Sequence, residues 1–273
     1  MKLKDFVSYI VHGAPPRIYA TIKTLSPDDK LKGKKIIVTG GGKGLGYYMA
    51  RKFVSEGAEV LITGRNEITL EKSAKELGCK YLALDIRNVK EINHFISEAE
   101  TLINGINCLV NNAGISLHEN SFLEVTEEQY DAQFDTNLKG SFFLTQGFIR
   151  HCMDLNIEGK KKILFISSET SMTVDERPYG LTKASLNSLI QGLACKFFDK
   201  DFIINAVAPG ITATDMTGYN HDGDLYIGLN PSKRVYLPEE VAEIASFLLS
   251  DVSNVLNGQI LYTNEGRTIN TRW

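Results

Sequence analysis

A glycine-rich turn at residues 39–46 constrains the fold of this chain more than any other feature of its sequence. The segment reads Thr-Gly-Gly-Gly-Lys-Gly-Leu-Gly and directly follows the apolar run of Ile36, Ile37 and Val38. A buried strand that breaks into glycines and then opens a helix lets backbone N–H groups approach a diphosphate. The glycine spacing differs from the common G-x-G-x-x-G fingerprint, but the turn still predicts a strand–turn–helix unit that binds a dinucleotide.

Strands and helices are expected to alternate from Lys34 onward, which is typical of a parallel sheet covered by helices on both faces. We expect strands near residues 34–39, 58–63, 80–84, 107–111, 162–167, 202–207 and 259–262. Helices are expected near residues 45–56, 67–77, 89–103, 127–155, 178–197 and 238–250. The pattern predicts an α/β fold, with one doubly wound, Rossmann-type parallel sheet in a single domain over residues 33–273.

Residues 1–32 are predicted to form an N-terminal extension in front of that domain. One short amphipathic helix is expected there, built on Phe6, Val7, Tyr9, Ile10 and Val11. Two interpretations stay open. The extension is either a packing arm or oligomer contact, or a contact with a partner or a membrane surface, because basic residues flank the apolar ones.

The composition excludes several other classes of protein. Of the 273 residues, 43% are hydrophobic and 23% are charged, so the chain can bury a large core. A net charge of −3 gives no reason to expect nucleic acid as a partner. No stretch has the length of a membrane span, and the scattered cysteines indicate neither a zinc site nor a disulfide framework. We expect a cytoplasmic protein with reduced thiols.

The end of the second expected strand indicates which dinucleotide binds. An acidic residue there would hydrogen-bond an adenosine 2′-hydroxyl, but the chain has Gly64 followed by Arg65. Lys43, in the glycine turn, approaches the same region. Two cations without a carboxylate suit a 2′-phosphate and favour NADP(H) over NAD(H). The alternative is that Arg65 is a surface residue that starts a helix.

Two other expected strands end in polar residues that suit a ligand crevice. Asp85 follows the third strand, where its carboxylate is able to accept the adenine amino group or simply to form a turn. Asn111 and Asn112 end the fourth strand, where asparagines either tie strand ends together and line the crevice or belong to an ordinary turn.

Tyr179 and Lys183 are the candidate reacting pair, because a spacing of four places both on one helix face. A free phenol is a poor acid at neutral pH, and a nearby cation is expected to lower its pKa. Tyr19 and Lys23 have the same spacing, but they precede the first strand. Only Tyr179 lies after a strand that ends in hydroxyl groups. Among these, Ser168 is placed to hydrogen-bond a substrate carbonyl oxygen, with Ser167 and Ser171 as open alternatives.

Together these motifs resemble the short-chain dehydrogenase/reductase family of the single-domain type, over about residues 34–266. The T-G-x-x-x-G-x-G turn at 39–46, N-N-A-G at 111–114 and the Y-x-x-x-K pair at 179–183 are typical of that family. So are an asparagine at Asn137, a serine at Ser168 and Pro-Gly at 209–210. The resemblance implies an NADP-dependent oxidoreductase that interconverts a carbonyl and a secondary alcohol by hydride transfer.

The resemblance also implies roles for individual residues. Tyr179 would be the general acid/base, and Ser168 would orient the substrate oxygen. Lys183 would hold the nicotinamide ribose and tune Tyr179, while Asn137 would support a water-linked proton relay. The residues expected to bind the cofactor are Gly40, Gly42, Lys43, Gly44, Leu45, Gly46, Arg65, Asp85, Ile86, Asn112, Ala113, Gly114, Tyr179, Lys183, Pro209, Gly210, Ile211, Thr212 and Thr214. A homo-tetramer built through the helices that hold Asn137 and Tyr179 is implied as well.

The chain departs from the family pattern in two places. The segment from Ser168 to Tyr179 is slightly shorter than is common, and residues 263–267 read Thr-Asn-Glu-Gly-Arg where an aspartate and two glycines are frequent. Residues 215–234, the position of a substrate lid, are polar, which suits a hydroxylated substrate or merely a solvated loop. A sugar, a steroid, a ketoacyl thioester and a simple ketone all stay open. A non-catalytic NADP-binding sensor and a sugar-nucleotide epimerase or dehydratase are the alternative functions.

Overall fold

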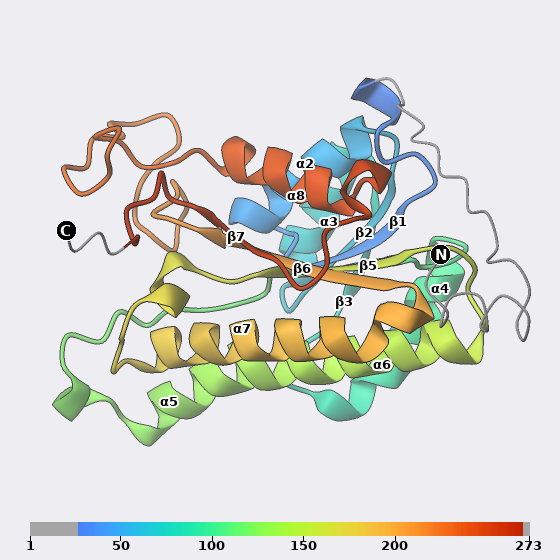
Figure 1. Ribbon diagram of the computed structural model, residues 1–273, viewed down its shortest axis with the longest axis horizontal. Coiled ribbons are helices and arrows are strands. Elements are labelled where there is room, and N and C mark those ends of the chain that lie inside the picture. Colours follow the sequence, from blue (N-terminus) through green and yellow to red (C-terminus); the bar gives the residue numbers. More distant parts are fainter. Residues whose placement is uncertain (1–26, 270–273) are drawn as a thin grey trace, which may run out of the picture.

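A parallel sheet of seven strands forms the centre of the computed structural model, which describes residues 27–269 (Figure 1). The strands lie in the order β3-β2-β1-β4-β5-β6-β7. Their bounds are β1 Lys35–Thr39, β2 Glu59–Gly64, β3 Lys80–Ala83, β4 Cys108–Asn111, β5 Lys161–Ile166, β6 Phe202–Pro209 and β7 Ile260–Thr263. The predicted α/β class and doubly wound sheet are confirmed, and the described residues form one domain.

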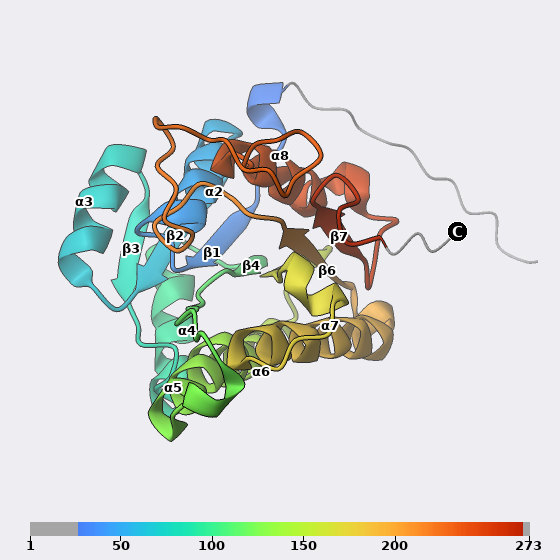
Figure 2. The same cartoon turned by 90° about the vertical axis from the view of Figure 1, so that its left-hand side faces the viewer.

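Helices cover both faces of the sheet (Figures 1 and 2). One core contains side chains of α2 Gly44–Ser55, α3 Glu67–Leu77 and α8 Pro238–Leu249. The opposite core contains side chains of α4 Ile92–Leu102, α6 Ser141–Asp154 and α7 Pro178–Phe197. Every residue of β5 and of β6 is buried, as expected for strands packed on both faces.

Local sequence signals set several helix starts. The side chain of Asn66 accepts a hydrogen bond from Thr69 N at the start of α3. Thr126 and Gln129 form a reciprocal capping box at the start of α5 Glu127–Gln133. Pro178 stands in the first turn of α7, where a missing N–H costs nothing.

The one long helix predicted over residues 127–155 is wrong. The chain forms α5, then a π-helical segment, η4 Phe134–Gly140, and then α6. Asn137 in the middle of η4 bonds to the backbone of Ile115, and Gly140 packs directly on Ile86. Both contacts are long-range, so they override the helical register that local propensity favours. The helix expected over 89–103 likewise begins with a short 3₁₀ segment, η2 Val89–Glu91, before α4. The other elements lie close to their predicted bounds.

Residues 27–32 pack against the sheet domain. A short 3₁₀ turn, η1 Pro27–Asp29, precedes Leu31, which is fully buried in the core beneath α2 and α8. Lys30 pairs with Glu56 at 3.2 Å. The remainder of the predicted extension, with its expected helix at Phe6 to Val11 and the pair Tyr19 and Lys23, lies outside the described residues.

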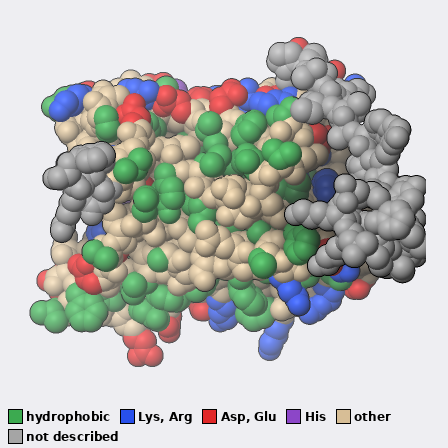
Figure 3. Space-filling view, in the orientation of Figure 1, with side chains coloured by type: hydrophobic (Ala, Val, Ile, Leu, Met, Phe, Trp, Pro, Cys, Tyr) green, Lys and Arg blue, Asp and Glu red, His purple; other side chains and the backbone are tan. Residues whose placement is uncertain are grey.

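The surface of the described part has two plain features. In the space-filling view, charged side chains of both signs gather at the upper and lower edges of this face, and the middle is largely uncharged (Figure 3). No helix within residues 27–269 is long and apolar enough to cross a membrane.

The strand order places the site. β1 and β4 are neighbours, and from them the chain winds outward in opposite directions, to β2 and β3 on one side and to β5, β6 and β7 on the other. In open α/β sheets, ligands bind outside the carboxyl ends of the strands at this switch point. The glycine turn after β1 lies at that position.

Close approach explains two of the glycines in this turn. Gly40 has a left-handed φ of +64°, and a Cβ added there would lie 3.0 Å from Nδ2 of Asn112. A Cβ at Gly46 would overlap the backbone carbonyl oxygen of Gly40 and approach Asn112 Nδ2 to 2.6 Å. The first turn of α2 therefore packs on the glycine turn with no space for a side chain.

We expect Gly46→Ala to lower the free energy of unfolding by about 2 kcal/mol, because the backbone must move to admit the methyl group. Gly192→Ala is the matched control, since Gly192 lies in exposed helix α7 with no atom within 4 Å of an added Cβ. It should raise that free energy by about 1 kcal/mol. Urea unfolding measures both, and equal stability of the two variants would contradict this packing.

Candidate functional site

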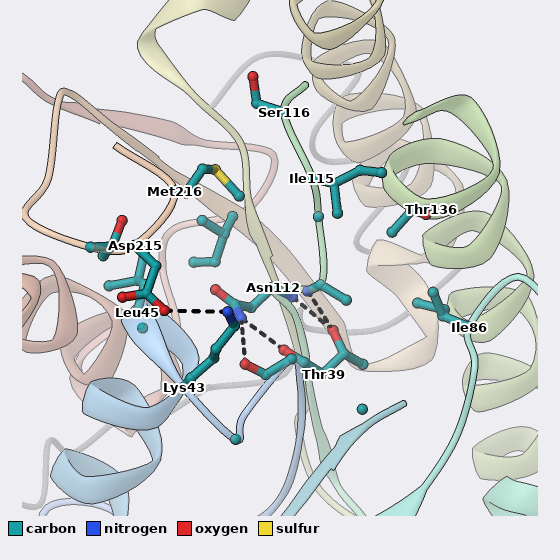
Figure 4. Close-up of a pocket in the computed structure, with 18 of the residues that line it drawn as sticks. Thr39, Lys43, Leu45, Ile86, Asn112, Ile115, Ser116, Thr136, Asp215 and Met216 are labelled. Atoms are coloured by element: carbon teal, nitrogen blue, oxygen red, sulfur yellow. Dashed lines mark hydrogen bonds and ion pairs between the residues drawn. The ribbon is translucent and has the colours of Figure 1, made fainter. Parts of the chain in front are cut away.

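A cavity of about 720 Å³ opens along the carboxyl edge of the sheet. Its walls come from the glycine turn, the ends of β2, β4, β5 and β6, the start of α7 and the loop after β6 (Figure 4). The volume lies within the range of small-molecule and cofactor sites. The cavity brings most of the predicted site residues together.

The glycine turn forms one wall and suits an anion. Gly40, Gly42 and Gly44 line the cavity, and α2 begins at Gly44 with its N-terminus toward it. The side chain of Lys43, at the N-cap, makes no capping hydrogen bond, so no side chain covers the first N–H groups of α2. A Cβ at Gly44 would meet nothing closer than Thr214 at 3.9 Å, which leaves room beside the helix start. A cofactor diphosphate fits this arrangement.

Thr39 locks the glycine turn to β4. Its Oγ1 accepts hydrogen bonds from the backbone N–H groups of Asn112 and Ala113, both at 2.9 Å, and donates to Val110 O at 3.2 Å. Asn112 Nδ2 donates in return to Thr39 O at 2.8 Å (Figure 4). Asn112 thus lines the cavity and also ties the two strand ends together, so the two interpretations of that residue are compatible.

Charged side chains surround the adenosine end of the cavity. Arg65 is exposed at the end of β2. Both carboxylate oxygens of Asp85 are engaged by Arg87, at 3.0 Å from Nε and 2.6 Å from Nη2, and these bonds lower the pKa of Asp85. Lys43 pairs with Asp215 of the loop after β6 at 3.2 Å (Figure 4). A hydrogen bond from adenine to Asp85 would therefore share its acceptor with Arg87.

Asn137 lies behind the cavity wall and holds it in place. Its Oδ1 accepts from Ile115 N at 2.8 Å, and its Nδ2 donates to Ile115 O at 2.9 Å and to Thr182 Oγ1 at 3.1 Å. Thr182 Oγ1 donates in turn to Tyr179 O at 2.7 Å. Through these bonds Asn137 connects the loop after β4 to the first turn of α7.

Tyr179 and Lys183 meet at the inner end of the cavity. Lys183 Nζ donates to Ile166 O, the last residue of β5, at 2.8 Å and lies 5.6 Å from the centre of the Tyr179 ring. Burial lowers the pKa of Lys183 to about 8. Burial also raises the pKa of Tyr179, against a hydrogen bond to Ser168 that lowers it. The expected lowering of this pKa by the neighbouring cation is thus wrong here, because desolvation of the phenolate dominates.

The three candidate serines have different partners. Ser168 Oγ accepts from Thr170 Oγ1 at 3.0 Å and also bonds to the Tyr179 side chain. Ser167 Oγ donates to Asn187 Oδ1 at 2.8 Å, and Ser171 Oγ donates to the backbone oxygen of Ser168 at 2.6 Å. Only Ser168, of the three, places its hydroxyl beside Tyr179.

The nicotinamide end is built from the segment after β6. Pro209, Thr212 and Thr214 line the cavity. Gly210 lies behind them, where a Cβ would come within 2.6 Å of the Tyr236 ring. Ile211 O accepts a hydrogen bond from Tyr236 N at 2.8 Å, so these two residues anchor the loop.

The wall differs from the predicted set in both directions. The predicted residues behind the wall are Gly46, Asn137, Gly210 and Ile211. Lining residues that sequence reasoning did not single out include Thr63, Gly64, Asn66, Thr69, Leu70, Ile115, Ser116, Leu117, Thr136, Ile166, Met216 and Thr217. Many directly follow a strand end or a motif residue, and that position is the signal that would have found them. His118 bonds to Met216 O at 2.8 Å, and Arg177 pairs with Asp175, so neither candidate is free to serve the cavity.

Comparison with known proteins gives one consistent family. A family model described as enoyl-(acyl carrier protein) reductase matches residues 40–268. The 3-oxoacyl-[acyl-carrier-protein] reductase FabG of Aquifex aeolicus is 32% identical over 247 residues, which is 87% of this chain and 98% of that protein.

Two solved structures are similar as well. A short chain dehydrogenase from Burkholderia cenocepacia in complex with NADP has a TM-score of 0.77 at 25% identity, over 87% of this chain and 99% of that one. A 3-ketoacyl-(acyl-carrier-protein) reductase from Brucella melitensis complexed with NADH has a TM-score of 0.80 at 27% identity, over 88% and 100%.

We expect Thr39→Val to lower the free energy of unfolding by about 2–4 kcal/mol, because two backbone N–H groups lose their acceptor. Thr63→Val is the matched control. Thr63 is the register partner of Thr39 and equally buried, yet its Oγ1 has no hydrogen-bond partner among the described residues. That substitution should leave stability unchanged or raise it. Guanidinium unfolding compares the pair, and similar losses in both would contradict the proposed lock.

Proposed function

The chain belongs to the short-chain dehydrogenase/reductase family of oxidoreductases, and we propose that it interconverts a carbonyl and a secondary alcohol by hydride transfer with NADP(H). One observation carries the proposal. Tyr179, with Ser168 hydrogen-bonded to it and Lys183 on the same helix face, stands at one end of a cavity whose opposite wall is an anion-binding glycine turn. The nicotinamide cofactor supplies and accepts the hydride.

The protein's own residues would handle the substrate oxygen and its proton. Ser168 and Tyr179 hydrogen-bond that oxygen, so negative charge that develops on it is stabilised as the hydride arrives. Tyr179 then donates its phenolic proton to the oxygen, and in the reverse direction it takes the proton back. Its raised pKa keeps the phenol protonated at neutral pH, which suits the reduction of a carbonyl.

Lys183 and Asn137 would support this proton transfer from behind. Lys183 remains largely charged at pH 7, since its pKa is about 8, and is placed to hold a ribose hydroxyl near Tyr179. The side chain of Asn137 is occupied by Ile115 and Thr182, so it would act by holding the wall and the π-helical turn beside which a proton relay would run.

Charge at the adenosine end supports NADP(H) over NAD(H). The solved relatives were crystallised with both cofactors, so the preference must come from this chain's own residues. β2 ends in Gly64 and Arg65, with no carboxylate to hold a 2′-hydroxyl and a cation to hold a 2′-phosphate. Lys43 would join Arg65 by leaving Asp215. Their ion pair is exposed and is worth at most about 1 kcal/mol.

The alternatives find less support. A sugar-nucleotide epimerase or dehydratase would need a substrate domain after β6, but residues 210–237 form a loop whose only strand-like features are two isolated bridges. A homo-tetramer is supported by a hollow on the helices that hold Asn137 and Tyr179. Its apolar walls are Phe134, Leu138, Phe142, Phe143 and Leu189. Sedimentation equilibrium of the full chain measures that assembly.

We expect Arg65→Asp to weaken NADPH binding roughly 100-fold, because the variant replaces an attractive charge beside the 2′-phosphate with a repulsive one. NADH binding should change far less, since the new carboxylate is able to accept a bond from the 2′-hydroxyl. Calorimetric titration with both nucleotides measures the ratio. Equal losses for the two would exclude Arg65 as the phosphate ligand.

We expect Tyr179→Phe to reduce turnover of a carbonyl substrate by a factor of about 10²–10⁴ and to leave NADPH affinity nearly intact, because only the proton donor is lost. Absorbance of the nicotinamide with a panel of ketones, ketoacyl thioesters and sugars measures the rate. Tyr130→Phe, at an exposed tyrosine stacked on Phe134, is the control. A Tyr179→Phe variant with near wild-type rates would overturn the acid/base assignment.

A further inference from the structure

A buried carboxylate directly follows Ser168 and has no part in the mechanism above. Glu169 opens the short turn η5 Glu169–Met172 and is only 4% exposed. Both of its oxygens are engaged by the C-terminal segment. Arg267 donates from Nε to Oε2 at 3.1 Å and from Nη2 to Oε1, and Asn264 Nδ2 donates to Oε2 at 3.1 Å.

The partners of Glu169 come from the stretch that departs from the family pattern. Residues 263–267 replace the frequent aspartate and two glycines, and here they fold back onto η5. Asn264 is almost fully buried, and its Nδ2 also reaches Thr268 Oγ1 at 2.8 Å. Thr268 Oγ1 in turn contacts Met172 Sδ at 3.5 Å. The C-terminal segment therefore clamps η5 at its first and last residues.

The other side of η5 is held by the strand and helix behind it. Asn187 of α7 donates from Nδ2 to Ser171 Oγ at 2.8 Å and to Tyr262 Oη at 3.1 Å. Ser171 Oγ donates to the backbone oxygen of Ser168. With the clamp on one side and Asn187 on the other, the backbone at Ser168 has little freedom to move.

The charge of Glu169 acts on Tyr179 as well. The carboxylate raises the pKa of Tyr179, a smaller effect than burial and opposite to that of the Ser168 hydrogen bond. Around the carboxylate the charged and titratable groups are Arg267 and Glu265 of the C-terminal segment, Tyr236 of the loop after β6, and Tyr179 and Lys183 of α7. The pKa of Tyr236 responds to Glu169 and to Arg267 with opposite signs.

We infer that Glu169 is a positioning residue: held by Arg267 and Asn264, it fixes the turn that presents Ser168 and supplies a negative charge, partly neutralised by Arg267, beside Tyr179. The inference deepens the proposed function and rests on it for the role of Tyr179. The C-terminal segment thereby adjusts the acid/base group of the site without touching the substrate.

A purely structural clamp and an electrostatic one give different results. If Glu169 and Arg267 only hold η5 in place, removing either partner weakens the same contact and has the same effect. If their charges act on Tyr179, the two removals shift its pKa in opposite directions, because one deletes the anion and the other deletes the cation that neutralises it.

The test is a pH titration of the full chain labelled with [¹³Cζ]tyrosine, in which Tyr179→Phe assigns the resonance of Tyr179. Glu169→Gln should lower the pKa of Tyr179 by about half a pH unit or more, and Arg267→Met should raise it by a similar amount. Arg267→Lys, which keeps the charge, should restore the wild-type value. Lys160→Met is the control, since its exposed ion pair with Asp201 lies at the opposite end of β5.

The pH profile of kcat/KM for carbonyl reduction is the second readout on the same variants. The alkaline limb should move to lower pH in Glu169→Gln and to higher pH in Arg267→Met. Shifts of the same sign, or no shift in the Tyr179 resonance, overturn the inference, also where stability falls. If no carbonyl compound is reduced, the proposed function fails, while the tyrosine titration still decides whether the clamp acts on Tyr179.

Discussion

The hydroxyl of Thr39 joins the two strands between which the site opens, and the rest of the site depends on that contact. β1 and β4 are neighbours at the point where the winding of the sheet reverses, so their carboxyl ends diverge into loops of opposite direction. Thr39 Oγ1 satisfies two N–H groups of the β4 loop and fixes the glycine turn at the same time. The start of α2 then faces a cavity instead of packing against a strand, which makes it available to a diphosphate.

The reacting end is held to the same sheet edge by backbone contacts. Lys183 bonds to the last carbonyl of β5, and Asn137 bonds to the loop after β4 and to α7. These bonds place Tyr179 beside Ser168 in a buried environment, where desolvation raises the phenol's pKa. The clamp on Glu169 adds a charge from the far end of the chain. Geometry thus comes from the sheet edge, while the proton affinity of Tyr179 comes from burial and from the charges that surround it.

Local patterns were sufficient to predict the strands, the glycine turn and most helix bounds, because burial on both faces and capping residues are properties of neighbouring residues. The break in the helix at Asn137 was beyond them, since it depends on a contact with Ile115, 22 residues away. The pair of Lys43 with Asp215 and the clamp of Arg267 on Glu169 span 172 and 98 residues. Motif residues such as Gly46 and Gly210 serve close packing behind the wall, so a motif by itself does not separate folding from binding.

The most direct test of the account is a crystal structure of the full chain with NADPH. The account predicts the diphosphate at the start of α2, the 2′-phosphate within about 3 Å of the Arg65 guanidinium, and the nicotinamide ring beside Tyr179 with its ribose on Lys183. A nucleotide bound elsewhere, or bound along the cavity with its nicotinamide away from Tyr179, would contradict the central claim that this sheet edge is a hydride-transfer site.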